Sequence, residues 1–321
     1  MNRLSRNSST AGCGVARVHS QRKGFYVPTE LAIVMPARNE EGCIRQTLDE
    51  WLDVLTTTGL TSADAVQVIV VDDGSTDGTT AILAELAASD PRVRFVRQTG
   101  IGHGPSVVNG YRLALESGAG HIFQVDSDNE FDPYEFPKLW QHRDRAPFVF
   151  GWRVRRSTPP SRRFISFSLR LLLNSLFGVR IPDANVPYRL MDRYYLAFAA
   201  DNIPPGTFIP NVCISVLAHT LQVPVINVPI THRKRTTGKV SIVSWRLARA
   251  CLRCLGQLLV WRLRFEGVRY NFAAHGTYSS GQLPWTHQHQ HQHQHPHQHQ
   301  PPHPPSHQHQ PSHQPPHDAA A

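Results

Sequence analysis

Long apolar runs and an even set of cysteines are both absent from this sequence. No stretch reaches the about 18 uncharged apolar residues that a membrane-spanning helix needs. The first two dozen residues also lack the apolar segment of a signal peptide. The five cysteines form no even framework, which favours a reducing compartment; they are Cys13, Cys43, Cys213, Cys251 and Cys254. We therefore expect a protein that is soluble or lies on a membrane surface.

Apolar residues are also scarce at both ends of the chain. Residues 1–27 are rich in Ser, Arg and Asn, and the tract 287–317 alternates His, Gln and Pro. Such segments bury too little apolar surface to offset the entropy of ordering, so we expect disorder at 1–27 and 271–321. The tail imidazoles could bind Zn²⁺, Ni²⁺ or Cu²⁺, although incidental affinity of a low-complexity extension is the simpler interpretation. Residues 28–240, followed by a helix at 241–270, suffice for one domain.

The charge is strongly basic and unevenly distributed. The formal net charge is +9, which predicts an anionic partner such as nucleic acid, a phosphorylated substrate or a membrane surface. Arg dominates between positions 153 and 269, whereas carboxylates gather in the first half of the chain. Charges that were merely solvated would not separate in this way.

Short β-branched runs alternate with helical patterns through the first half. Strands are expected at 31–35, 66–71, 93–97 and 121–125, with helices at 41–55, 79–88 and 106–117. This alternation predicts an α/β domain whose mostly parallel, Rossmann-like sheet is covered by helices on both faces. Ligands bind such sheets at the carboxyl ends of the strands. Asp72 and Asp73 follow the second strand, and Asp126 and Asp128 follow the fourth.

The segment Asp126-Ser-Asp-Asn-Glu130 has the strongest chemical pattern. Alternating carboxylates on one side of an extended segment repel one another unless a cation neutralises them. Hard oxygen ligands suit Mg²⁺ or Mn²⁺, which commonly take one or two carboxylates together with phosphate oxygens. The alternative is a solvated acidic turn, but the position after an apolar strand favours a metal site at Asp126, Asp128 and Glu130.

Two glycine-containing turns accompany the carboxylates. Asp72-Asp-Gly-Ser-Thr-Asp-Gly78 joins a strand to a helix, and helix capping alone does not explain two consecutive carboxylates at its tip. Gly100-Ile-Gly-His-Gly104 precedes the next helix, where backbone N–H groups can approach an anion. The spacing differs from a dinucleotide fingerprint, and by itself the loop could be an ordinary turn.

The second half is less regular and more basic. Strands are expected at 148–153 and 223–229, with helices at 162–177, 211–221 and 241–265. The first and last of these helices combine Arg with aromatic and aliphatic residues. This pattern is typical of helices that lie in a membrane interface, although core-facing helices with outward Arg would look similar.

Together these motifs resemble the family-2 glycosyltransferases, whose fold is called GT-A. The resemblance rests on Pro36-Ala-Arg-Asn-Glu40, the turn at 71–79, the Gly-His-Gly-Pro loop and the Asp126-Ser-Asp128 segment, and it covers about 31–241. It implies a nucleotide-sugar donor held by Pro36, Arg38, Glu40, Asp72, Asp73 and Gly104. It also implies Mg²⁺ or Mn²⁺ at the Asp126 and Asp128 pair, with Glu130 nearby where the family often has Gln.

The segments at 183–193 and 228–241 are similar to polyprenyl-phosphate glycosyltransferases, including dolichyl-phosphate mannose synthase. This resemblance implies an inverting transfer of a hexose from a UDP- or GDP-sugar to a lipid phosphate. Further residues expected to bind the diphosphate or acceptor phosphate are Arg153, Arg189, His232, Arg233 and Arg235, with Arg233 and Arg235 counted as catalytic. Many relatives have a carboxylate base near 211, where this chain reads Thr-Phe-Ile-Pro-Asn211. A phosphate acceptor is already ionised and needs no base.

We therefore expect a cytoplasmic enzyme that is peripheral to the membrane, with no nucleic-acid partner and with a membrane-anchoring subunit as one option. The first alternative is the same donor chemistry with a soluble or polysaccharide acceptor. A second alternative is a non-catalytic scaffold that binds membranes, nucleic acid or metal through its basic surface and His tail.

Overall fold

The computed structural model describes residues 29–154, 160–231, 233, 244–274, 277–278 and 281–282. Contacts divide the chain into two units, Met1–Ala274 and His275–Ala321. Within the described part of the second unit, β8 (Thr277–Tyr278) pairs with β9 (Gly281–Gln282). The fold that carries the candidate site lies in the first unit.

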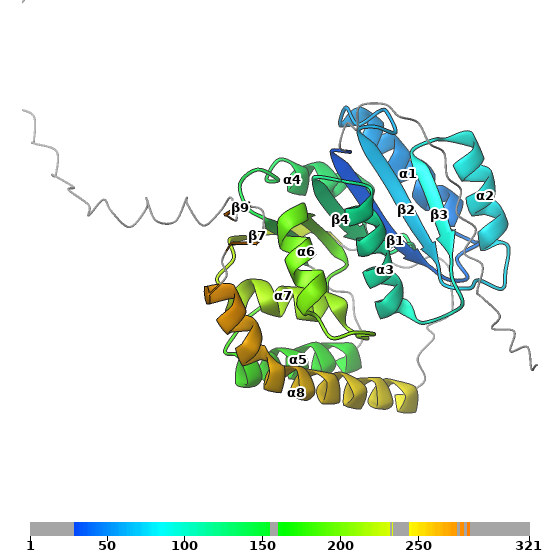
Figure 1. Cartoon of the computed structure of the whole chain (residues 1–321). Coiled ribbons are helices and arrows are strands. Elements are labelled where there is room, and N and C mark those ends of the chain that lie inside the picture. Colours follow the sequence, from blue (N-terminus) through cyan, green and yellow to red (C-terminus); the bar gives the residue numbers. More distant parts are fainter. Residues whose placement is uncertain are drawn as a thin grey trace, which may run out of the picture. The chain divides into compact units, whose positions relative to one another are not determined.

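The first half follows the predicted alternation of strands and helices (Figure 1). All three predicted helices and all four predicted strands are present, with bounds that differ by a few residues. The third helix begins three residues earlier than predicted, so that the glycine loop supplies its first turn. The elements are β1 (Leu31–Ala37), α1 (Ile44–Thr57), β2 (Val66–Asp72), α2 (Thr79–Ser89), β3 (Val93–Arg97), α3 (His103–Glu116) and β4 (His121–Val125).

The second half contains elements that the sequence patterns did not reveal. A short strand, β6, and the helix that follows it without a loop were not predicted, nor were η1 and α4. The elements are η1 (Pro133–Glu135), α4 (Phe136–Trp140), β5 (Phe148–Arg153), α5 (Pro160–Phe177), β6 (Tyr188–Asp192), α6 (Arg193–Asn202), α7 (Pro210–Thr220), β7 (Val225–Ile230) and α8 (Ser244–Ala274). The proposed boundary at 270 falls inside α8, because the helix continues for four more residues.

One seven-stranded sheet runs through this unit in the order β3-β2-β1-β4-β6-β5-β7. Only β6 is antiparallel to its neighbours β4 and β5 among the described strands of this sheet. The carboxyl ends of the parallel strands therefore meet the amino end of β6 at a single edge. The predicted mostly parallel α/β sheet is confirmed.

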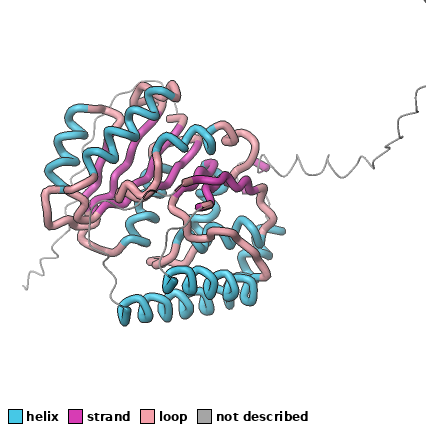
Figure 2. Tube along the Cα trace, turned by 180° about the vertical axis from the view of Figure 1, so that it is seen from behind, coloured by secondary structure: helices cyan, strands magenta, loops and turns pink. Residues whose placement is uncertain are grey.

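Helices cover both faces of the sheet (Figures 1 and 2). The helices α1, α2 and α4 lie on one face, while α3, α6 and α7 lie on the other. The pair α5 and α8 lies side by side beyond α7. Because α5 and α8 do not cover the sheet, each can keep one long side in solvent.

The core is centred on β1, which is buried along its whole length. Trp51 of α1 packs against Phe123 of β4, Phe136 of α4 and Tyr188 of β6. Large aromatic side chains from four elements thus bury apolar surface directly beneath the carboxyl end of β4. This packing gives the acidic segment that follows β4 a rigid base.

Candidate active site

The acidic segment after β4 is held by α1 from below. The buried carbonyl oxygen of Ser127 accepts hydrogen bonds from Thr47 Oγ1 (3.3 Å) and Cys43 Sγ (3.5 Å). Asn129 has a φ of 55°, and the Asp128 carboxylate accepts from the Glu130 N–H at 3.2 Å. These contacts fix the backbone, so the Asp126 and Asp128 carboxylates project from a defined turn.

Asp126 lies in an environment that opposes its ionisation. Loss of hydration raises the pKa of Asp126 to about 6; His103 lowers it in part, and Asp128 and Glu130 raise it further. The His103 Nε2 atom lies 3.8 Å from the Asp126 carboxylate, across from the acidic segment. A group of carboxylates that repel one another in this way gains stability from a nearby cation.

A cavity of about 320 Å³ opens beside these carboxylates at the carboxyl edge of the sheet. We call it the acidic cleft. The segments after β1 and β4 and the loop before α3 supply its walls. Its lining residues are Pro36, Ala37, Arg38, Glu40, Asp73, Gly102, His103, Ser106, Asp126, Ser127 and Asp128. The fold therefore brings together six residues that were predicted to bind the donor or metal and that come from three separate parts of the chain: Pro36, Arg38, Glu40, Asp73, Asp126 and Asp128.

Asp73 organises the glycine loop. Its two carboxylate oxygens accept hydrogen bonds from the backbone N–H groups of Ile101 (2.8 Å) and Gly102 (2.9 Å) and from Gln98 Nε2 (2.9 Å). Burial raises the pKa of Asp73, but these hydrogen bonds more than offset burial, and the net direction is below the usual value. Arg38 Nη1 lies 3.5 Å away.

Asp72 is fully buried and, unlike Asp73, has hydrogen-bond partners close to it in the sequence. It accepts from the Ser75 N–H (2.9 Å) and from Thr80 Oγ1 (2.6 Å). Asp72 does not line the acidic cleft, and its carboxylate fixes the turn that leads into α2. Of the two consecutive carboxylates, only Asp73 reaches the cleft.

The metal ligands would have to come partly from outside the protein. Among the described residues, no three His, Cys, Asp or Glu side chains converge into a metal site of their own. Asp126 and Asp128 fit a hard cation, because they are paired carboxylates with a raised pKa at Asp126. A divalent ion bound there would take further oxygens from a phosphorylated ligand.

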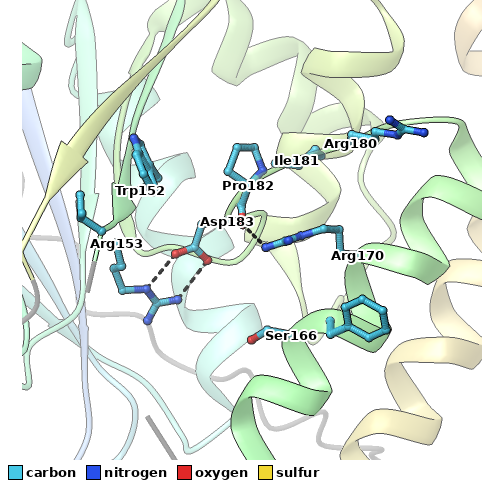
Figure 3. A pocket seen from close by; sticks show the side chains of 10 residues that line it. Trp152, Arg153, Ser166, Arg170, Arg180, Ile181, Pro182 and Asp183 are labelled. Carbon is cyan, nitrogen blue, oxygen red and sulfur yellow. Dashed lines mark hydrogen bonds and ion pairs between the residues drawn. The ribbon is translucent and has the colours of Figure 1, made fainter. Parts of the chain in front are cut away.

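A second and larger cavity, of about 640 Å³, lies between the end of β5 and α5 (Figure 3). We call it the arginine pocket. It is lined by Trp152, Arg153, Val154, Ser166, Phe167, Arg170, Arg180, Ile181, Pro182 and Asp183. Arg153 makes a two-pronged ion pair with Asp183, at 2.8 and 3.0 Å, and Arg170 donates to the Pro182 carbonyl oxygen at 3.1 Å. The charge of Arg153 also lowers the pKa of Asp126 slightly, so a residue of this pocket acts on a carboxylate of the acidic cleft.

Sequence reasoning identified Arg153 but missed the other polar residues of this pocket and also His103 of the cleft. Ser166 and Arg170 were predicted only as part of the polar side of an amphipathic helix, and Arg180 gave no signal of its own. The acidic residue at the start of the 183–193 motif, Asp183, could have been paired with a nearby Arg, but no spacing rule identified which one.

Two predicted phosphate-binding arginines have other partners. Arg189 is fully buried in β6, and its guanidinium donates to the carbonyl oxygens of Val186, Ala184 and Asn211. Burial lowers the pKa of Arg189. The structure places this side chain in the core, with backbone carbonyl oxygens as its partners, and does not bring it into the acidic cleft.

Arg233 is held behind the acidic segment. It forms ion pairs with Glu50 (2.6 Å) and Asp132 (2.7 Å) and donates to Asn129 Oδ1 (3.1 Å). Its backbone N–H donates to the Glu130 carbonyl oxygen at 2.8 Å. Arg233 therefore supports the turn that follows Asp126 and Asp128 from outside the cleft. His232 and Arg235 lie outside the described residues.

Gly104 also differs from its predicted role. A Cβ atom at this position would lie 2.2 Å from the Thr207 carbonyl oxygen. The glycine allows α3 to approach the loop before α7, and Gly104 does not line the acidic cleft.

Comparisons with known proteins agree with this arrangement. The Glycosyl transferase family 2 model matches residues 32–197. The undecaprenyl-phosphate mannosyltransferase of Micrococcus luteus is 29% identical over 211 residues, covering 63% of this chain and 85% of the relative. The polyprenol monophosphomannose synthase of Mycolicibacterium smegmatis is 30% identical over 183 residues, covering 54% of this chain and 69% of the relative.

Solved structures agree on the fold. The glucosyl-3-phosphoglycerate synthase of Mycobacterium tuberculosis, in a complex with Mn²⁺, UDP and product, superimposes with a TM-score of 0.54 at 18% identity, covering 75% of this chain and 85% of that one. Together with the sheet order and the acidic cleft, these matches confirm the predicted GT-A fold. The chain belongs to glycosyltransferase family 2 and is a glycosyltransferase.

Proposed function

We propose that this enzyme transfers a hexose from a UDP- or GDP-sugar to a polyprenyl phosphate at a membrane surface, with inversion at the anomeric carbon. The observation that carries the proposal is the arginine pocket beside the acidic cleft, since the two cavities suit a donor and an anionic acceptor of the same reaction. Two relatives whose names specify polyprenyl-phosphate acceptors support this choice.

The acidic cleft is the proposed donor site. Pro36, Arg38 and Glu40 would contact the nucleotide, and Asp73 keeps the glycine loop in place beside it. Asp126 and Asp128 would hold Mg²⁺ or Mn²⁺, with Glu130 nearby. When bound, this ion would offset the negative charge that develops on the leaving diphosphate. His103 faces the same space and can donate a hydrogen bond to a phosphate oxygen.

The arginine pocket is the proposed acceptor site. Its lining includes three guanidinium groups, those of Arg153, Arg170 and Arg180, and one carboxylate, that of Asp183. Each planar guanidinium can offer two parallel N–H donors to phosphate oxygens. The resulting excess of positive charge suits a phosphate monoester, which carries close to two negative charges near neutral pH.

The pocket provides no general base, and this reaction needs none. Asp183 is the carboxylate among the described lining residues, and Arg153 holds it in an ion pair. Asn211, at the position where many relatives have an acid, is buried beneath α3 and accepts from Tyr111. An ionised phosphate oxygen would attack the anomeric carbon directly. The new C–O bond forms as the bond to the nucleoside diphosphate breaks on the opposite side.

Exposed apolar side chains on α5 and α8 favour a lipid acceptor over a soluble one. Phe167 and Leu171 of α5 are 61% and 58% exposed, and Leu252 and Leu263 of α8 are 69% and 83% exposed. Arg249 and Arg253 are exposed on the same helix. This composition supports peripheral membrane binding on the cytoplasmic side. No helix in the described part of the chain is long and apolar enough to span a bilayer.

The test is transfer from labelled UDP- and GDP-sugars in the presence of Mn²⁺. One arm contains vesicles with a polyprenyl phosphate, a second contains a soluble phosphate monoester, and a third contains EDTA. Metal-dependent transfer to the lipid alone is expected. Equal transfer to the soluble phosphate would favour the soluble-acceptor alternative, and the absence of any donor binding would overturn the proposal.

A further inference from the structure

The loop between α6 and α7 is attached to α8 at both of its ends. Trp261 of α8 donates from Nε1 to the Asn202 carbonyl oxygen at 3.1 Å. Gln257, one helical turn earlier, accepts from the Phe208 backbone N–H through Oε1 at 3.1 Å. Trp261 is buried, whereas Phe208 is exposed. Two side chains of α8 therefore fix the start and the end of this loop.

A cavity lies beside this attachment, and both Gln257 and Trp261 line it. The cavity has a volume of about 490 Å³ and lies between residues 201–205 and one side of α8. Its lining from α8 includes Gly256, Val260 and Arg264. Because the cavity leaves part of the loop without contact to α8, we expect the hydrogen bonds of Gln257 and Trp261 to hold the loop at its position on the helix.

The other side of the same loop supports α3. A Cβ atom added to Gly104 would lie 2.2 Å from the Thr207 carbonyl oxygen and 2.9 Å from Phe208 backbone atoms. Thr207 is fully buried, and its hydroxyl accepts from the Ile209 N–H. The first turn of α3 thus rests directly on loop backbone that cannot move independently.

This first turn of α3 also forms one wall of the acidic cleft. The Gly102 N–H is bonded to Asp73, and His103 lies 3.8 Å from Asp126. A continuous set of contacts therefore leads from α8, through the loop, to two residues that line the cleft.

We propose that Gln257 is a positioning residue for the acidic cleft, and that α8 acts through the α6–α7 loop to hold the first turn of α3 in place. The helix with the exposed apolar side chains then does more than provide a surface, because its position determines the shape of the donor-binding wall. The effect on donor affinity rests on the proposed function, whereas the structural effect on α3 does not.

Hydrogen exchange of the full-length protein tests the structural step. Gln257→Ala removes the acceptor for Phe208, and we expect faster exchange in the peptides that contain Ile101, Gly102 and Ser106. Gln257→Glu retains an acceptor oxygen and should exchange like the wild type. Gln141→Ala, which removes an exposed side chain at the end of α4, is the matched control. Unchanged exchange in Gln257→Ala would overturn the proposal.

Donor binding and vesicle binding separate this proposal from the proposed function. Gln257→Ala should weaken nucleotide-sugar affinity by about threefold to tenfold, the effect of losing one hydrogen bond, with unchanged acceptor KM and vesicle binding. Gln257→Glu should restore the affinity. Equal losses in donor and acceptor KM would contradict a positioning role at the cleft. A wild-type protein that bound no donor would remove the proposed function, and hydrogen exchange would still decide the role of Gln257.

Discussion

The acidic cleft and the arginine pocket are adjacent but are assembled in opposite ways. Carboxylates of the cleft follow β2 and β4 directly, so each is placed by the strand that precedes it. Guanidinium groups of the pocket come from the end of β5, the middle of α5 and the loop before β6. A site at strand ends is encoded by short motifs, whereas a site between helices and loops depends on tertiary packing. The comparison shows why acidic motifs were easier to interpret than basic ones.

The two cavities also differ in how their charges are balanced before a ligand binds. Asp126 lies beside other carboxylates and has a raised pKa. Arg153, in contrast, already has a carboxylate partner in Asp183. We therefore expect the cleft to gain stability from an added cation, whereas an anion that entered the pocket would have to exchange or share an existing ion pair. The first two of the following variants test this contrast, and the other two change places outside both cavities.

The largest effect is expected from Asp128→Ala in the acidic cleft. Loss of a carboxylate that would hold the cation should lower kcat by about 10²–10³-fold, since metal stabilisation of a leaving group is worth several kcal/mol. The measurement is transfer at saturating Mn²⁺, together with Mn²⁺ titration. Asp144→Ala is the control, because this carboxylate is 75% exposed in the turn after α4 and does not line the cleft. Full activity of Asp128→Ala would contradict the metal assignment.

The second prediction concerns Arg153→Ala in the arginine pocket. Removal of a charged hydrogen-bond donor should raise the acceptor KM by about 10- to 100-fold and leave donor affinity nearly unchanged. Arg153→Lys should recover only part of the loss, because an ammonium lacks the planar pair of donors. Arg145→Ala, whose side chain contacts His142 outside the pocket, provides the control. A loss confined to donor affinity would assign Arg153 to the cleft.

The third prediction separates the membrane surface from both cavities. Leu263→Ser should weaken binding to anionic vesicles by about tenfold, because a leucine side chain that enters an apolar environment contributes roughly 1.5–3 kcal/mol. Donor affinity in solution should stay the same. Tyr194→Ser changes a 54% exposed side chain on α6 and should bind vesicles like the wild type. Co-sedimentation with vesicles provides the measurement, and equal binding by all three proteins would exclude α8 from the contact surface.

The smallest effect is expected from Asp192→Asn, at the end of β6 remote from both cavities. Burial raises the pKa of Asp192 to about 7, from 3.8. Between pH 3.8 and about 7, the folded state therefore binds more protons at Asp192 than the unfolded state does. The contribution of protonated Asp192 to the free energy of unfolding is lost as the pH rises through 7. Asn keeps an oxygen for the Tyr195 N–H but does not ionise.

Thermal unfolding of both proteins at pH 5 and pH 8 checks this prediction. The free energy of unfolding of the wild-type protein should fall by a few kcal/mol or less between pH 5 and pH 8, since a tenfold change in proton affinity is worth about 1.4 kcal/mol. Asp192→Asn should lose less, so that the variant is relatively more stable at pH 8. A larger pH dependence in the variant would mean that the hydrogen bond from the Tyr195 N–H stabilises the ionised Asp192 carboxylate.

The sequence was sufficient to predict the first half of the fold because its signals are local. Buried strands such as β1 are continuous apolar runs, and the helices between them have a clear period. In contrast, β6 contains five residues, includes a buried arginine and passes into α6 without a loop. Neither length nor alternation marks such a strand, so its position in the sheet could not be predicted.

The same limit applies to individual site residues. Asp126 and Asp128 line the cleft, as the position of the motif after an apolar strand indicated. Arg189 and Arg233 looked like phosphate ligands because both are basic and lie near other motifs. Glu50, which pairs with Arg233, and Asn211, one of the backbone partners of Arg189, are distant in sequence and come close only when the chain is folded.

The reversed direction of β6 has a practical consequence for engineering. Because the loop before β6 also enters at the carboxyl edge, both cavities use one edge of the sheet and leave the opposite edge without them. The turn between α1 and β2 lies at that opposite edge, and Thr61, Ser62 and Asp64 in it are exposed. A fluorophore or an affinity label attached there would lie away from the acidic cleft and the arginine pocket.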